Sequence, residues 1–437
     1  MRNSDWLTRR EFARSVAAFG LSAALPLSLP GKDRKKKLHP DSLPVPQRET
    51  RSYTGSDSLR VHAAAVGLLA GCAVVPELLN LTADGDGIHD VYTQTVAEQA
   101  GILVAENAMK WSSLRPSPSS YNFAPVDKIF AFAAQYQQFV RGHNLCWHEQ
   151  LPLWFAQVAT KDNARSLLEQ HIQTVAGRYA GRVHSWDVVN EAVHIPGGRA
   201  DGLRKSPWLE LLGPGYIEMA FQYASQADPQ AKLTYNDFDI ELDTPEQSAK
   251  RGQVLMLVRR LHARGVPIHA VGIQSHLQAN GPPPGAGVKQ FIRDLAAIGL
   301  DVYLTELDVN SHALPGGPEL QDVAVSEIYK NYLGLVLPEP NVKAVLTWGI
   351  TDAHTWLNQS RQPWAMRPDG ARQRPLPFDD NYTPMPAFFA MRDAMDFSRM
   401  PITPADITAP LQQPAADPYA PFAVPGSPET PQTQPKP

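Results

Sequence analysis

The chain has 437 residues, 43% of them hydrophobic and 19% charged, with a formal net charge of −4 at pH 7. This length allows one large hydrophobic core, and the slightly acidic charge argues against a nucleic acid or an anionic membrane surface as a partner. A neutral polymer is a better match for this net charge as a binding partner. The two cysteines, Cys72 and Cys146, lie in apolar runs, which predicts buried free thiols, although the sequence also allows a disulfide between them.

Residues 1–31 have the pattern of an export signal. The run Thr8–Arg14 resembles a twin-arginine signal, and the moderately apolar segment Ser15–Pro30 follows it. Gly20 and Pro26 interrupt this segment, which is too short to span a bilayer permanently. We expect export to the periplasm or the extracellular space, with no stable membrane insertion after signal removal. A retained N-terminal anchor and a cytosolic amphipathic start are the alternatives.

Two further stretches differ in composition from a folded domain. Residues 32–52 are basic and polar and are then interrupted by prolines, which predicts a flexible linker. Residues 399–437 are rich in Pro, Gln and Thr, and we expect a disordered tail because they cannot bury enough apolar area to fold. A single folded domain is therefore expected over residues 53–398.

Within that domain, short apolar segments alternate with amphipathic ones. The segments with the composition of buried strands are residues 63–67, 102–106, 139–145, 183–190, 232–236, 270–274, 301–306 and 342–348. Helical patterns between them cover residues 126–136, 163–179, 217–227, 245–264, 288–298 and 321–337. This alternation predicts a parallel sheet, and eight strands suffice to close a (β/α)8 TIM barrel. A doubly wound open sheet is the alternative, but the glycine-rich dinucleotide-binding fingerprint is missing.

Two of these predicted strands end in an acid. Residues 301–306 combine strand-forming side chains with a terminal Glu306, and residues 183–190 lead through Asn190 to Glu191. A buried strand end is a costly place for a carboxylate that serves only solubility. Because the carboxyl ends of all barrel strands meet on one face, we expect the two acids to meet there, as acid/base cleavage of a glycosidic bond requires.

The other predicted strand ends carry amide, imidazole, carboxylate and indole groups. This mixture suits a neutral polyhydroxylated ligand, because amides and acids bond hydroxyls and aromatic faces pack on sugar rings. His143, His148 and Glu149 form only a weak candidate for a metal site, since nothing resembles a zincin helix. We therefore expect no metal and no cofactor.

Several sequence blocks resemble the signatures of glycoside hydrolase family 10, the retaining endo-β-1,4-xylanases. They are Arg141–Trp154, Trp186–Glu191, Thr305–Asp308, Thr347–Asp352 and the closing run Tyr382–Phe388. The resemblance runs in order through all eight predicted strands. It implies a (β/α)8 barrel with the two catalytic acids on the fourth and seventh strands.

The resemblance also implies roles for individual residues. Glu191 would be the general acid/base and Glu306 the nucleophile of a double displacement with retention of configuration. Asn190 matches an asparagine that bonds the sugar 2-hydroxyl, and His276 with Asp308 matches a pair that orients the nucleophile and holds it ionised. Positions matched to substrate binding are Glu106, Asn107, Lys110, His143, Trp147, Gln150, Asn236, Gln274, Trp348 and Trp356.

These matches imply an endo-1,4-β-xylanase that acts on xylan or xylo-oligosaccharides, and we expect the protein to be a monomer. The alternatives are a retaining β-glycanase of the same clan acting on another β-1,4-glycan or on short xylo-oligosaccharides, and a binding protein that has lost turnover. The intact set of acids argues against the last. The family commonly has Tyr and Asn where Phe238 and Asp239 stand, Lys at Met385 and Val at Cys146. The first two changes put the affinity for the leaving sugar in question.

Overall fold

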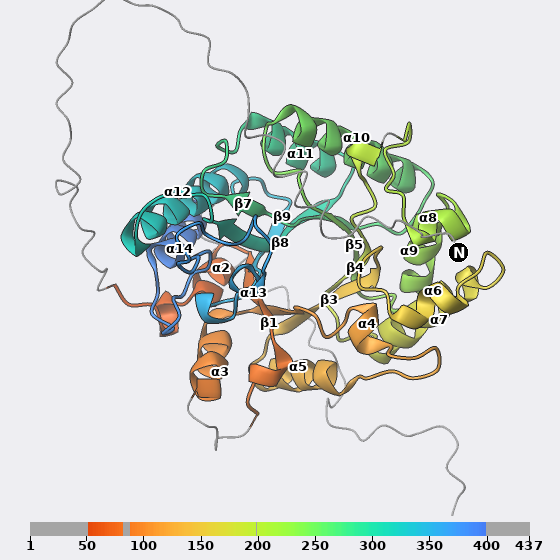
Figure 1. Ribbon diagram of the computed structural model, residues 1–437, viewed down its shortest axis with the longest axis horizontal. Coiled ribbons are helices and arrows are strands. Elements are labelled where there is room, and N and C mark those ends of the chain that lie inside the picture. Colours follow the sequence, from red (N-terminus) through yellow and green to blue (C-terminus); the bar gives the residue numbers. More distant parts are fainter. Residues whose placement is uncertain (1–50, 82–87, 198, 399–437) are drawn as a thin grey trace, which may run out of the picture.

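The computed structural model describes residues 51–81, 88–197 and 199–398 (Figure 1). The predicted signal segment, the predicted tail and all but the last two residues of the predicted linker lie outside this described part. Those two residues contact helix α14 (Pro386–Ser398): Arg51 Nη1 donates to Asp393 at 3.1 Å, and Arg392 Nη1 donates to the Ser52 carbonyl at 2.6 Å. In the described part, no helix is long and apolar enough to cross a membrane.

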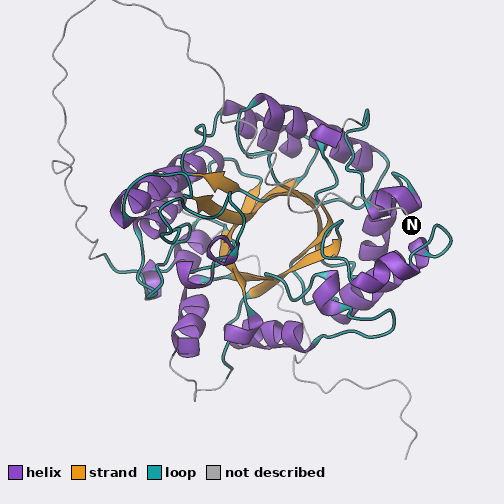
Figure 2. Cartoon of the chain, viewed as in Figure 1, coloured by secondary structure: helices purple, strands orange, loops and turns teal. Residues whose placement is uncertain are grey.

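Eight parallel strands close into a ring surrounded by helices, which is the (β/α)8 barrel predicted from the sequence (Figure 2). Each strand pairs with its neighbours along the chain, and β9 returns to pair with β1. Strands such as β2 are buried at every residue, as expected of a parallel sheet covered on both faces. The barrel strands are β1 (Leu69–Val74), β2 (Ile102–Ala105), β3 (Phe139–Cys146), β4 (Ser185–Asn190), β5 (Lys232–Asp237), β6 (Ala270–Ile273), β8 (Asp301–Asn310) and β9 (Val342–Thr347). A ninth strand, β7 (His276–Gln278), pairs with the outer end of β8.

Helices lie outside the ring and cover it (Figures 1 and 2). The six helical patterns found in the sequence correspond to α5, α7, α9, α10, α11 and α12, with ends within three residues of those predicted. The helices are α2 (Leu59–Ala65), α3 (Ile88–Gln99), α4 (Trp111–Leu114), α5 (Ala124–Gln135), α6 (Leu153–Val158), α7 (Ala164–Arg178), α8 (Pro207–Leu212), α9 (Tyr216–Ala227), α10 (Pro245–Ala263), α11 (Ala286–Ala296), α12 (Pro318–Val336), α13 (Trp356–Gln359) and α14, with 3-10 turns η2 (Gly55–Asp57), η3 (Pro76–Leu78), η4 (Ile195–Gly197) and η5 (Asp352–His354).

The prediction of the first strand was wrong. Residues 63–67 belong to the end of α2 and the turn after it, and the strand is the next apolar run, β1. The reason is local, because three consecutive alanines favour a helix, and Leu59 and Ala63 are buried four residues apart on one helix face. Gly67 then takes a φ of 70°, which ends the helix and turns the chain into β1.

The described part of the chain has three clusters of buried hydrophobic residues, the smallest of them made by Leu357, Trp364 and Ala365. A large cluster fills the space between strands and helices, and a small one fills the inside of the barrel with residues such as Val104, Tyr303 and Leu346. Polar side chains from β3 and β4 share this interior: Arg141 and Asp187, both 1% exposed, form an ion pair there. The packed interior supports the carboxyl ends of the strands, where functional residues of such barrels gather.

Candidate active site

Glu191 follows directly after β4, at the carboxyl end of the barrel. Its φ of 57° is left-handed, and its N–H donates to the carbonyl of Asn236 on β5 at 2.8 Å. Such a conformation is costly for a residue with a side chain, and strain of this kind is concentrated at functional sites. Its Oε1 accepts hydrogen bonds from the side-chain amides of Asn190, at 3.2 Å, and Gln274, at 3.0 Å. The carboxyl group is therefore held by neighbours while its side chain stays partly exposed.

Glu306 lies within β8 and not at its end as the sequence suggested. The strand continues to Asn310, and its pairing with β9 is irregular between Leu304 and Leu307. Irregular pairing of this kind can redirect a side chain within a strand. The Glu306 side chain is buried, 5% exposed, and its carboxylate accepts a hydrogen bond from Asn236 Nδ2 at 2.8 Å and contacts His276 Nε2 at 3.3 Å.

Asn236 connects the two glutamates and does not face outward as a substrate contact. Its side chain is fully buried, its Nδ2 donates to Asn190 at 2.9 Å as well as to Glu306, and its Oδ1 accepts from the Thr305 hydroxyl at 2.7 Å. A Cβ at Gly272 would lie 2.1 Å from this Oδ1, so the glycine makes room for the amide. The sequence assigned Asn236 to substrate binding, whereas its contacts make it a positioning residue.

Gln274 makes a second connection between the acids. Its carbonyl accepts from the Glu306 N–H at 2.9 Å, and its side-chain amide donates to Glu191, with a weaker contact of 3.4 Å to Asn190. Only 3% of Gln274 is exposed. Like Asn236, it was assigned to substrate binding and has its amide engaged within the site. The acids of β4 and β8 are thus held around one gap.

His276 and Asp308 lie together beside Glu306. His276 Nδ1 contacts Asp308 Oδ1 at 2.8 Å, and its other ring nitrogen faces Glu306. The remaining Asp308 oxygen accepts from the indole N–H of Trp356 at 2.7 Å. Trp356 was expected only to bind the substrate, and it also donates to the carboxylate that contacts His276.

Charge on this side of the site favours an ionised Glu306. Burial alone would raise its pKa, but the hydrogen bond with His276 and the positive charges of His143, His276 and Lys110 outweigh it and lower the pKa to about 2. Burial lowers the pKa of His276, but Asp308 and Glu306 more than compensate, and this pKa lies well above its ordinary value. A carboxylate that is anionic under all ordinary conditions is suited to act as a nucleophile.

Polar and aromatic side chains from the segments that follow β2, β3 and β9 meet near the barrel mouth. Lys110 Nζ lies 5.3 Å from the ring centre of Trp147 and 5.6 Å from that of Trp348, and donates to Asn107 at 3.0 Å. Asn107 donates in turn to Glu106 at 3.2 Å, and burial raises the pKa of that glutamate despite Lys110. This group can supply hydroxyl contacts and flat faces to a sugar.

His143 and Gln150 complete the predicted set on β3 and the loop after it. Gln150 has a φ of 49° and is partly exposed, and its carbonyl accepts from the Ser112 N–H. His143 is 2% exposed, with Nδ1 2.9 Å from Asp187 Oδ2, and Asp187 is also paired with Arg141. Sequence reasoning missed Asp187 and Arg141. Both residues could have been found, because they lie inside the sequence blocks that resemble the family signatures.

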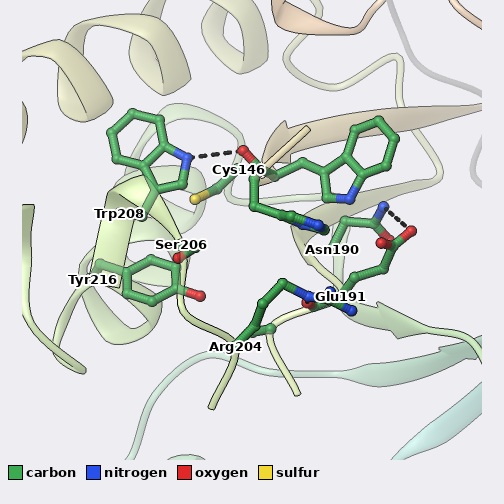
Figure 3. A pocket seen from close by; sticks show the side chains of 10 residues that line it. Cys146, Asn190, Glu191, Arg204, Ser206, Trp208 and Tyr216 are labelled. Carbon is green, nitrogen blue, oxygen red and sulfur yellow. Dashed lines mark hydrogen bonds between the residues drawn. The ribbon is translucent and has the colours of Figure 1, made fainter. Parts of the chain in front are cut away.

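On the other side of Glu191, a narrow cavity lies between the ends of β3 and β4 and the segment leading to α8 (Figure 3). Arg204 extends into this region toward Glu191, and its Nε donates to the Glu191 carbonyl at 2.7 Å. No pattern in the residues around Arg204 indicated this contact. The cavity is lined by Cys146, Trp147, His148, Asn190, Glu191, Ala192, Arg204, Ser206, Trp208 and Tyr216.

The sequence matches the family model described as Glycosyl hydrolase family 10 over residues 58–394. The chain belongs to this family. It is 37% identical to endo-1,4-beta-xylanase B of Thermotoga neapolitana, over 70% of this chain and 83% of that protein, and 36% identical to beta-1,4-xylanase of Dictyoglomus thermophilum, over 68% and 83%. Its fold resembles native xylanase 10B of Thermotoga maritima, with a TM-score of 0.69 and 34% identity over 78% of this chain and 98% of that one. Xylanase 10B of Thermotoga petrophila RKU-1 in complex with xylobiose has a TM-score of 0.69 and 32% identity over 79% and 99%.

The departures from the common family 10 pattern have defined places in the structure. Lys250 Nζ lies 3.7 Å from the centre of the Phe238 ring and 2.7 Å from Asp237, so the ring packs against a buried ion pair. Burial raises the pKa of Asp239, and Lys250 only partly offsets this. Met385 is buried against Arg374. The two cysteines are buried and free, as one of the two sequence interpretations had it.

Proposed function

We propose that this family 10 glycoside hydrolase is an endo-1,4-β-xylanase that cleaves internal β-1,4-xylosidic bonds with retention of configuration. The observation that carries the proposal is that Asn236 and Gln274 each bond both Glu191 and Glu306, which holds two carboxyl groups of different character around one gap. Two such groups are the requirement for a double displacement.

In the first step, ionised Glu306 attacks the anomeric carbon while the bond from that carbon to the leaving oxygen breaks. Glu191, in its protonated form, gives its proton to that oxygen as it departs. The burial of Glu306 and its bond to His276 support this assignment, because a buried anion with a lowered pKa needs no deprotonation before it attacks. The product is a glycosyl ester of Glu306 and a shortened chain.

In the second step, a water molecule attacks the anomeric carbon of the ester from the side that the leaving sugar occupied. Glu191, now a carboxylate, takes the proton of the water, and the bond to Glu306 breaks. Two inversions at one carbon give net retention. Glu191 therefore has to serve in both protonation states, and the amides of Asn190 and Gln274 that contact its Oε1 keep it in place through the exchange.

Binding of the sugar before the cleaved bond is assigned to the group at the mouth. We assign aromatic contacts to Trp147 and Trp348, and hydroxyl contacts to Glu106, Asn107, Lys110, His143 and Gln150. Xylan as the substrate is supported by the names of the relatives and by the xylobiose complex of the Thermotoga petrophila enzyme. A second candidate is another β-1,4-glycan, because a relative 36% identical over 74% of this chain is named exoglucanase XynX, from Acetivibrio thermocellus.

The test compares release of reducing sugar from xylan, cellulose and mannan, with the configuration of the first product followed by NMR. We expect xylan to be the preferred polymer, a mixture of product lengths typical of internal cleavage, and the β-anomer to appear first. An α-anomer would overturn the double displacement, and a preference for cellulose or mannan would favour the second candidate.

We also propose that the chain is exported through its twin-arginine-type N-terminus and acts as a monomer. The support is the sequence pattern of residues 1–31 alone for export. Fractionation of cells expressing the full chain, with Arg9 and Arg10 both changed to Lys as the comparison, tests export. Light scattering of the purified protein tests whether it is a monomer in solution.

A further inference from the structure

Ser275 connects two residues that touch different acids of the site. Its neighbour Gln274 donates from its side chain to Glu191. Its other neighbour, His276, contacts Glu306 through Nε2. Ser275 lies between the end of β6 and the start of β7, so its backbone sets how both neighbouring side chains are aimed. Its φ of 67° is left-handed, which is costly for a residue with a side chain and persists only where the surroundings hold it.

Glu241 holds Ser275 through its carboxyl group. Oε1 of Glu241 accepts from the Ser275 N–H at 2.9 Å, and Oε2 accepts from the Ile240 N–H at 2.7 Å. Because Glu241 comes from the loop between β5 and α10, it ties that loop to the corner between β6 and β7. The Ser275 hydroxyl donates to the Ile273 carbonyl at 3.1 Å and contacts the Tyr332 hydroxyl at 2.9 Å, which also hold this residue.

Glu241 is itself fixed by its surroundings. It is 2% exposed, and its N–H donates to Gln247 Oε1 at 3.1 Å. Arg251 on α10 donates to the carbonyls of the two residues that flank Glu241. The acid Asp239 in the same loop and the phenol of Tyr332 on α12 lie close enough to interact with it electrostatically. A buried carboxyl group needs hydrogen-bond partners, and one of those found here is the backbone of the candidate active site.

We propose that Glu241 is a positioning residue, which keeps Ser275 in its left-handed conformation and so aims the side chains on either side of it at the two catalytic acids. This inference rests on the proposed function. Without the bond to Glu241, the strain at Ser275 would be released and both neighbouring side chains would move. The amide on Glu191 supports proton transfer to the leaving sugar, and the ring beside Glu306 keeps the nucleophile ionised. A loss of Glu241 therefore weakens both acids at once.

This role depends on hydrogen bonding and not on charge. Burial and the charge of Asp239 raise the pKa of Glu241 to about 7, so the group is uncharged at the acid pH where the ionisation of Glu306 is measured. A substitution of Glu241 at that pH removes an acceptor and no charge. Any change in the protonation of Glu306 then reports a change of position.

The test uses 2,4-dinitrophenyl β-xylobioside, whose leaving group needs no proton, so that kcat/KM reports the attack by ionised Glu306 alone. The burst of dinitrophenol before the steady state measures formation of the covalent intermediate. Glu241→Met removes both acceptor oxygens at similar side-chain length, and Glu241→Gln keeps one oxygen that can accept from Ser275. The control is Glu339→Met, the same change at a buried acid that pairs with Arg293 and precedes β9.

We expect Glu241→Met to move the acid limb of kcat/KM to higher pH by at least about half a unit, because His276 is no longer aimed at Glu306. Its kcat on xylan should also fall about tenfold, since the amide of Gln274 no longer holds the acid/base. Adding Glu241→Met to His276→Gln should shift the acid limb no further than His276→Gln alone. Glu241→Gln should keep the acid limb of the unmodified enzyme, and Glu339→Met should keep both the acid limb and kcat.

An unchanged acid limb in folded Glu241→Met would overturn the proposal, as would a shift of equal size in Glu339→Met or a further shift in the double variant. If Glu241→Met fails to fold by circular dichroism, Glu241→Asp decides with the same criterion, since its shorter side chain keeps the acid but cannot reach both N–H groups. Glu306→Gln separates the two levels of inference. A burst that persists in Glu306→Gln would refute the proposed function, whereas its loss there together with an unmoved acid limb in Glu241→Met would refute only the role of Glu241.

Discussion

Asn236 and Gln274 bond the two glutamates in a reciprocal manner. The backbone carbonyl of Asn236 accepts from the N–H of Glu191, and its side-chain amide donates to the carboxylate of Glu306. The backbone carbonyl of Gln274 accepts from the N–H of Glu306, and its side-chain amide donates to the carboxylate of Glu191. The residue whose backbone carbonyl holds one glutamate therefore also bonds the carboxyl group of the other glutamate with its side chain.

Gln274→Met tests this arrangement, because it removes the amide at Glu191 but leaves the backbone bond to Glu306. We expect kcat on xylan to fall about tenfold, the equivalent of one hydrogen bond to a charged group, with little change in the burst on 2,4-dinitrophenyl β-xylobioside. Steady-state and stopped-flow kinetics measure the two effects. Gln290→Met, on exposed surface, serves as the control. A loss of the burst in Gln274→Met would show that the amide also acts on Glu306.

Glu306→Gln should abolish turnover while xylo-oligosaccharide affinity stays within about tenfold. The neutral amide has nearly the same shape but cannot form the covalent intermediate. Calorimetric titration measures affinity, and reducing-sugar release measures turnover. Glu319→Gln on the surface is the matched control. Turnover at the normal rate in Glu306→Gln would exclude Glu306 as the nucleophile.

Glu191→Ala should slow hydrolysis of xylan much more than the first step on aryl xylobiosides with good leaving groups. Only the natural leaving oxygen needs a proton, and that proton contributes about 10²–10⁴-fold in rate. The measurement is the dependence of the rate of the first step on the pKa of the leaving phenol, with Glu210→Ala as the control. A loss of equal size on every leaving group would contradict the assignment of Glu191 as the acid.

His276→Gln should move the acid limb of kcat/KM to higher pH by at least about one unit. Activity requires ionised Glu306, and the substitution removes a hydrogen bond and a positive charge that lower the pKa of Glu306 to about 2. Burial then dominates and raises the pKa of Glu306. As the pH falls, the enzyme therefore loses its active form, with Glu306 ionised, at a higher pH than before. The rate is measured from pH 3 to pH 8, with His262→Gln on α10 as the control. An unchanged acid limb would mean that His276 does not act on the protonation of Glu306.

Glu241→Gln should flatten the pH dependence of stability between pH 4.5 and pH 7. Glu241 is 2% exposed, and burial and the charge of Asp239 raise its pKa from 4.5 to about 7, although the N–H groups of Ser275 and Ile240 bond it. The folded protein retains this proton longer than the unfolded chain, so the stability it contributes is complete below pH 4.5 and lost as pH rises through 7. The loss is on the order of 3 kcal/mol in the unfolding free energy. Thermal melts of both proteins across this range measure it, and parallel curves would contradict the assignment.

The barrel and its two acids were predictable because they follow from local pattern. Glu191 follows a buried strand and Glu306 lies in another, and a barrel brings the strand ends to one face. The extent of β8 beyond Glu306 was not predictable, since Leu307 and Val309 are apolar but their pairing partners are set by the barrel. The alanine run 63–65 was predicted as a strand because it is apolar, although alanine favours a helix, and Leu59 and Ala63 are buried on one face of α2.

Roles that depend on where a side chain points could not be obtained from the sequence. Asn236 and Gln274 stand at strand ends like the residues expected to face the substrate, but the register of β5 and β6 turns their amides toward the acids. Arg204 lies in a loop with no periodic pattern, and its hydrogen bond to the Glu191 carbonyl spans that loop. Sequence thus identifies which chemical groups are present, and the register determines which of them touch.

The joined ends of the domain have a consequence for engineering. Arg51 and Ser52 are bonded to Asp393 and Arg392 of α14, so the chain enters and leaves the barrel at neighbouring points. A short peptide could splice these points and let the polypeptide start elsewhere on the ring, as permuted proteins with adjacent termini do. Such a rearranged enzyme would carry any fused partner on a chosen loop while leaving Glu191 and Glu306 untouched.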